Sequence, residues 1–151
     1  MYSMTRCALS IAVATLALSS VAIAQAQFGT EAEAKSMLDK AVAAVKVDKA
    51  KALGDFNKGE GGFKDRDLYP FCANASDGVI TAHPSLGGKQ IREIKDKDGK
   101  ALGEEIMKTA AEGKVSSVEY KWPRPGTDAP VPKVTFVTKV ADQVCAVGYY
   151  K

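Results

Sequence analysis

The order of helical and strand-like segments constrains the fold of this 151-residue chain most strongly. Between residues 31 and 56 apolar residues recur every three or four positions, and this spacing predicts helix. From residue 68 the chain divides into short alternating runs separated by turn residues, which is typical of strands. The resulting order is helix, helix, strand, strand, helix and three further strands. It predicts an α+β domain with an antiparallel sheet.

The helical part begins with a capping box, in which Thr30 is followed three residues later by Glu33. Asp48 either continues or restarts the helix, and the glycines from Gly59 onward end it. A short helix is expected near residues 89–94, and a second over 102–112. We expect a stiff loop with four prolines at 123–132. The predicted strands are residues 68–73, 79–83, 115–122, 133–140 and 143–150.

The N-terminal sequence resembles a secretory signal peptide. Arg6 precedes an apolar run over residues 8–24, and small residues mark cleavage sites after Ala24 or Ala26. We therefore expect a signal peptide at 1–26 and one domain at 27–151, exported to the periplasm or secreted. An uncleaved membrane anchor is the alternative, and the run is at the short limit for a span.

Net charge and cysteine content further limit the functions that the chain can have. The formal net charge of +3 falls to +2 when Arg6 leaves, and the remaining charges alternate in sign without a basic stripe. Nucleic-acid binding is therefore not expected. Cys72 and Cys145 remain, and in an exported chain they form either a disulfide or two buried thiols. With His83 as the single histidine, no metal site and no cofactor are expected.

Aromatic and cationic residues gather beside the predicted strands. Strand alternation sends Tyr120 and Trp122 to one face. Arg124 lies in the proline-rich loop, and Lys133 follows it. Together with His83 they provide the side chains of a small-molecule pocket that holds an anion. The alternative interpretation is that the rings cover core, that His83 is structural and that both cations are solvated.

Three motifs resemble the second type of the single Cache family, the extracytoplasmic sensor modules of bacterial receptors. They are Ala82-His83-Pro84, the loop from Trp122 to Gly126, and Pro132-Lys133. The resemblance implies a PAS-like five-stranded antiparallel sheet behind a long N-terminal helix. It also makes the first and last strands neighbours, so a disulfide between Cys72 and Cys145 becomes geometrically reasonable.

The resemblance further implies a sensor-type domain that binds a small organic carboxylate without turnover, and so no enzyme. Lys133, with His83 or Arg124, would neutralise the anion, and Tyr120 would donate a hydrogen bond. Because no signalling module follows the last strand, we expect the protein to present its ligand to a membrane receptor or transporter. A homodimer through the N-terminal helix is an open expectation. The candidate ligand-binding residues are Phe71, His83, Tyr120, Trp122, Arg124, Lys133 and Tyr149.

Two other classes of function stay open. One is a partner-binding or assembly protein with a degenerate pocket, in which the aromatics form an interface. The other is a small hydrolase or lyase on the same scaffold, which needs a proton-transfer pair. His83 with Asp77 is the pair that the sequence offers.

Overall fold

A computed structural model describes residues 27–151, and the expected signal peptide lies outside them. Among these residues, no helix combines the length and the apolar character needed to cross a membrane. The helices are α1 (Glu31–Val47), α2 (Lys49–Lys58), the 3-10 helix η1 (Ile91–Glu93) and α3 (Leu102–Thr109). The strands are β1 (Pro70–Asn74), β2 (Ile80–Ala82), β3 (Ser116–Pro123), β4 (Pro130–Val140) and β5 (Gln143–Tyr150).

The five strands form one antiparallel sheet in the order β2-β1-β5-β4-β3, which confirms the predicted fold class. The first and last strands are neighbours, and Cys72 lies directly opposite Cys145 in their register. The two cysteines form a disulfide, so the expected pairing is confirmed. Both are fully buried on the face of the sheet that α1 covers.

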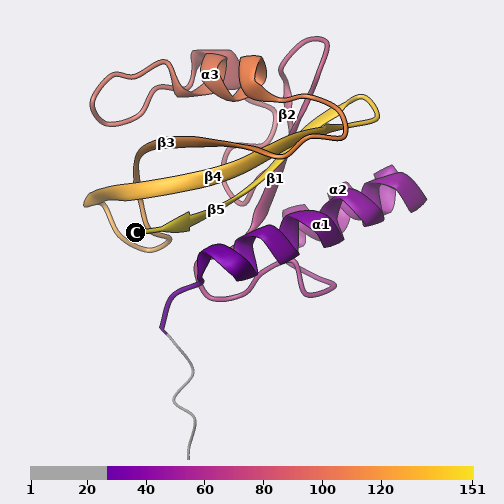
Figure 1. Ribbon diagram of the computed structural model, residues 1–151, viewed down its shortest axis with the longest axis horizontal. Helices are drawn as coiled ribbons and strands as arrows, with labels where there is room; N and C mark the ends of the chain where they lie inside the picture. The colour runs from indigo at the N-terminus through magenta and orange to yellow at the C-terminus, as the bar shows by residue number, and fades with distance from the viewer. Residues whose placement is uncertain (1–26) are drawn as a thin grey trace, which may run out of the picture.

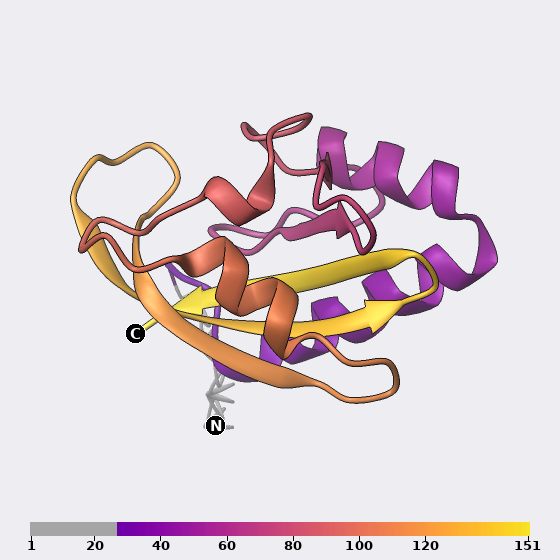
Figure 2. The same ribbon diagram turned by 90° about the horizontal axis from the view of Figure 1, so that it is seen from above.

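Helices cover the two faces of the sheet (Figures 1 and 2). Helix α1 packs on β5 and β4, whereas α3 packs on the opposite face against η1 and β3. Alternation along β4 feeds both cores, because Phe136 contacts the α1 side and Val137 contacts the α3 side. The candidate site lies on the α3 side.

Caps define the two N-terminal helices. The Thr30 hydroxyl accepts a hydrogen bond from the Glu33 N–H and the Glu33 carboxylate accepts one from the Thr30 N–H, which confirms the capping box. Asp48 ends α1, and its carboxylate accepts from the Lys51 N–H at 3.0 Å to begin α2. The helix therefore restarts at Asp48. Gly59 ends α2 in the left-handed region at φ 68°.

The proline-rich segment is more ordered than expected. Strand β3 extends to Pro123 and β4 begins at Pro130, so the loop covers only residues 124–129. Pro132 is compatible with β4 because its backbone faces the end of β5. There its carbonyl accepts the last hydrogen bond, from the Lys151 N–H, and the N–H that proline lacks is not needed.

Two helices are also shorter than expected. The 3-10 helix η1 covers less than the predicted residues 89–94. Helix α3 ends at Thr109, because residues 111–114 form bridges instead.

Candidate functional site

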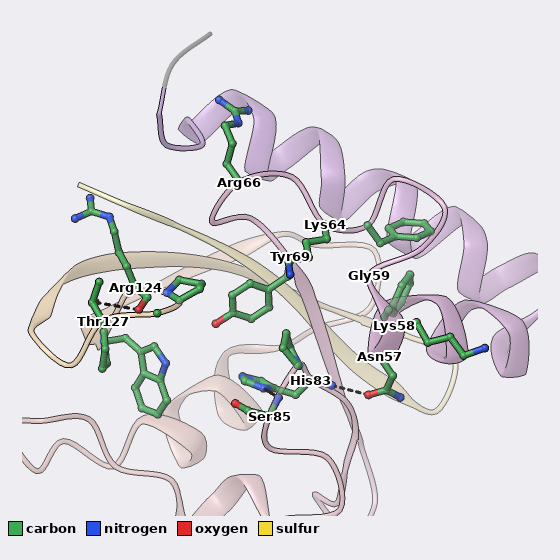
Figure 3. Close-up of a pocket in the computed structure, with 17 residues that line it drawn as sticks. Asn57, Lys58, Gly59, Lys64, Arg66, Tyr69, His83, Ser85, Arg124 and Thr127 are labelled. Atoms are coloured by element: carbon green, nitrogen blue, oxygen red, sulfur yellow. Dashed lines mark hydrogen bonds between the residues drawn. The ribbon is translucent and has the colours of Figure 1, made fainter.

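Two neighbouring cavities share the walls Tyr69, His83 and Trp122, and the inner one lies on the α3 side of the sheet. The outer cleft has a volume of about 480 Å³ and lies between the end of α2, the end of β2 and the 124–129 loop. Figure 3 shows the Tyr69, His83 and Ser85 side chains at its centre. The inner cavity, about 30 Å³, is closed by α3 and η1. Its other lining residues are Phe71, Ile80, Leu86, Ile91, Ile94, Leu102, Gly103, Ile106 and Tyr120.

Tyr120 and Trp122 face this cavity together, as alternation predicted. Their rings are 6.3 Å apart in an edge-to-face arrangement, and both line the inner cavity. Lys121 lies on the other face and pairs with Asp98 at 2.8 Å. The Tyr120 hydroxyl shares a 2.7 Å hydrogen bond with the Thr135 hydroxyl, and burial raises the pKa of Tyr120 above its ordinary value. Tyr120 therefore remains a neutral phenol.

Lys133 is the buried cation of the site, with 2% of its surface exposed. Its Nζ donates to the hydroxyls of Tyr69 at 3.2 Å and Tyr150 at 3.3 Å, and lies 4.6 Å from each ring centroid. Within residues 27–151 no carboxylate lies within ion-pair distance of it. Burial lowers the pKa of Lys133 to about 7, partly offset by the charge of Asp67. Among residues 27–151 the ammonium therefore has no paired counter-ion, and Lys133 lines neither of the two cavities directly.

His83 is held as a neutral donor. Its Nδ1 accepts hydrogen bonds from the backbone N–H groups of Ser85 at 3.0 Å and Leu86 at 3.2 Å, so the proton resides on Nε2. Burial, together with the charge of Lys133, lowers the pKa of His83 to about 4. Its ring lies 5.5 Å from that of Tyr69. The imidazole can donate to a ligand but cannot act as a base through Nδ1.

The proton-transfer pair of the hydrolase hypothesis is not formed in this structure. The Asp77 carboxylate accepts from the backbone N–H of Val79 at 2.9 Å. The nitrogen of His83 that such a carboxylate would need to orient is already occupied by two backbone donors. Asp77 is exposed in a turn, so the structure gives the pair no geometry for general-base catalysis.

Arg124 belongs to the rim of the site. Its guanidinium lies 4.2 Å from the Phe28 ring and 4.9 Å from the Tyr150 ring, and its Nε is 3.6 Å from Asp67 Oδ2. Asp67 is itself held by the Gly29 N–H at 2.7 Å. Figure 3 shows the guanidinium pointing away from the outer cleft. In this arrangement Arg124 lines the outer cleft while its guanidinium contacts Tyr150 and Asp67.

The last two predicted residues lie on opposite faces of the sheet. Phe71 lines the inner cavity. Tyr149 stacks on Phe136 on the α1 side, and its hydroxyl donates to Glu31 at 3.2 Å. The reason is strand alternation, which sends the residue after Tyr149 to the pocket side instead. The structure thus brings Phe71, His83, Tyr120, Trp122 and Lys133 together and separates Tyr149 from them.

Two residues that shape the site, Tyr150 and Thr135, were not among the candidates that sequence reasoning selected. The hydroxyls of Tyr150 and Tyr69 accept hydrogen bonds from Lys133, and Thr135 supplies the hydrogen-bond partner of Tyr120. Alternation could have identified Tyr150 and Thr135, since both lie on the pocket side of their strands. Among the described residues no group of three or more His, Cys, Asp or Glu side chains could hold a metal ion.

Comparison with known proteins identifies the class that this fold and site define. Residues 9–149 match the family described as Single Cache domain 2, and the chain belongs to that family. A curated relative is the methyl-accepting chemotaxis protein McpP of Pseudomonas putida, 34% identical over 56 residues. The match covers 37% of this chain and 10% of McpP, so the chain aligns with only about a tenth of that receptor.

Solved structures share the fold. A methyl-accepting chemotaxis protein from Vibrio parahaemolyticus superposes with a TM-score of 0.64 at 25% identity, covering 80% of this chain and 87% of that one. The periplasmic sensor domain of a chemotaxis protein gives 0.59 at 25% identity, covering 79% and 88%. A Cache chemosensory domain described for carboxylic acid recognition gives 0.57 at 24% identity, covering 79% and 86%.

Proposed function

We propose that this protein is an exported Cache domain that binds a small organic carboxylate reversibly and without turnover. The observation that carries the proposal is Lys133, an ammonium buried between two tyrosine rings with no carboxylate partner in residues 27–151. A buried charge is costly unless it is paired, so an anion close to it is stabilised strongly. A ligand carboxylate supplies that missing charge.

The surroundings of Lys133 suit the rest of such a ligand. His83 offers a neutral N–H donor, and Tyr69 connects Lys133 to both cavities. The inner wall is apolar apart from these groups, which favours a small ligand with an apolar body. The carboxylic acid recognition of the similar Cache domain agrees with this chemistry.

The location and partners follow from the same proposal. A signal peptide cleaved after Ala24 or Ala26 would deliver residues 27–151 to the periplasm or the exterior. There the loaded domain would contact a membrane receptor or transporter, in keeping with the chemotaxis proteins that it resembles. A homodimer through α1 remains part of the proposal.

A thermal-shift screen with carboxylates of two to six carbons tests the proposal. A ligand at a hundred times its Kd should stabilise the fold by about 2.7 kcal/mol. We expect Lys133→Met to abolish the shift, because it removes the cation and keeps an unbranched side chain. Lys121→Met, on the opposite face, should preserve it. The proposal fails if no acid shifts the folded wild type, and a stable oligomer would then favour the assembly role.

A further inference from the structure

Gly148 lies inside the central strand β5, where a glycine is unfavourable. Its backbone φ is not in the left-handed region, so the conformation would accept any residue. A glycine within a strand weakens it and often marks a close approach of other atoms. The reason for glycine at this position must therefore be the space that a side chain would fill.

That space is filled by two residues of the candidate site. A Cβ added at Gly148 would lie 2.3 Å from Thr135 Oγ1 and 2.5 Å from Lys133 Cε. Strand β5 lies between β4, which carries Lys133, and β1, which follows Tyr69. The lysine side chain must therefore pass over β5 to bring its Nζ to the Tyr69 hydroxyl, and it does so at Gly148.

We propose that Gly148 is a positioning residue of the anion site. The absence of its side chain places the Lys133 ammonium against the hydroxyls of Tyr69 and Tyr150. The same space seats the Thr135 hydroxyl against Tyr120. Gly148 touches no ligand in this account and acts only through these neighbours. Its effect on ligand affinity rests on the proposed function, whereas its effect on the position of Lys133 does not.

A ligand-free NMR titration tests the positioning directly. With ¹³C at the lysine Cε, the wild type should show one lysine that titrates near neutral pH, because burial lowers the pKa of Lys133 to about 7. Lys133→Met assigns that signal by removing it. In Gly148→Ala we expect the signal to move toward the other lysines, because the displaced ammonium reaches water. An unchanged Lys133 titration in Gly148→Ala overturns the proposal.

Two further variants serve as a control for this titration and as a substitute if Gly148→Ala does not fold. Gly54→Ala is the matched control, because a Cβ there meets nothing within 4 Å, and it should leave the Lys133 signal unchanged. If Gly148→Ala does not fold, Thr135→Ala combined with Gly148→Ala removes the closest contact and retains the one with Lys133. The combined variant should still shift the Lys133 titration relative to Thr135→Ala alone, and an identical titration contradicts the proposal.

Calorimetry with acetate, propionate and butyrate supplies the second readout. Gly148→Ala should weaken binding by about tenfold or more, while in the Lys133→Met background it should add little, since coupled residues are not additive. Wild-type affinity in Gly148→Ala overturns the positioning role. If the wild type binds none of these acids, the carboxylate proposal loses its support, and the NMR titration alone decides the role of Gly148.

Discussion

At the scale of single residues, the chemistry of the pocket depends on what surrounds Lys133. Two phenol hydroxyls solvate its ammonium, and no carboxylate within residues 27–151 neutralises it. His83 remains neutral because burial and the nearby ammonium lower its pKa to about 4. The site therefore has one charge that responds to pH near neutrality, and that charge has the sign that attracts an anion.

The stability of the fold should depend on pH through Lys133. Its pKa is about 7 in the fold, against about 10.4 in an unfolded chain. Between these values the unfolded chain binds more protons, so the free energy of unfolding rises with pH from about 7 to about 10.4, and the Lys133 contribution is constant below about pH 7. Urea unfolding across this range should show the rise in wild type and not in Lys133→Met. Parallel pH profiles would contradict the assignment.

The hydrogen bond between Tyr120 and Thr135 should show strong coupling. Tyr120→Phe leaves the buried Thr135 hydroxyl without its partner, so we expect a loss of about 1–3 kcal/mol in the free energy of unfolding. Thr135→Val should cost a similar amount. The double variant should cost less than the sum, because neither polar group then remains unpaired. Additive losses measured in urea would show that the bond contributes little.

The sequence could predict which side chains contact each other only where the contact follows from a local pattern, such as alternation along one strand. Alternation correctly placed Tyr120 and Trp122 together and Lys121 apart, because neighbouring positions on one strand decide it. The burial of Lys133 could not be predicted in this way. It depends on Tyr69, which is 64 positions away in the sequence. Arg124 likewise pairs with Asp67 and stacks on Phe28, contacts that no local pattern encodes.

At the scale of elements, caps and ladder registers position the site. Asp48 divides the N-terminal helical segment in two. Asn57 in the last turn of α2 then contacts the end of β2, donating to the Thr81 carbonyl and accepting from the His83 N–H. The helical periodicity and the capping box were sufficient to predict helix over these residues, but they left open whether the helix continues or restarts at Asp48. The extension of β3 and β4 through prolines was not predictable, because it requires knowing where β5 ends.

Replacing the shared cap tests this division of the helices. Asp48→Ala removes the carboxylate that accepts from Lys51 N–H, and loss of such a cap costs about 1 kcal/mol of folding stability. Asp39→Ala, at an exposed position within α1, is the matched control and should be nearly neutral. Urea midpoints for the two variants give the comparison. Equal midpoints would mean that the Asp48 cap contributes nothing.

At the scale of the whole molecule, the sheet order joins the two ends of the domain. Strand β5 lies beside β1, and the Cys72–Cys145 disulfide crosses between them over 73 positions of sequence. This order is not a local property of the sequence, and it was anticipated only through the resemblance to Cache domains. The disulfide lies on the α1 side, so it stabilises the scaffold without entering the pocket.

Removing the disulfide should lower stability while leaving the pocket intact. For a loop of this length the loop-entropy estimate is about 4 kcal/mol. Urea unfolding of Cys72→Ala combined with Cys145→Ala measures the loss, and carboxylate binding below the transition should persist. A loss below about 1 kcal/mol would contradict the expected constraint on the unfolded chain.

The central claim, that Lys133 binds a carboxylate as its ammonium, is tested most directly by calorimetry at two pH values. The acid with the largest thermal shift should bind wild type more tightly at about pH 6 than at about pH 8.5, because Lys133 is protonated only at the lower value. Lys133→Met should bind weakly and without this pH dependence. Equal affinities for the two proteins at both pH values would contradict the claim.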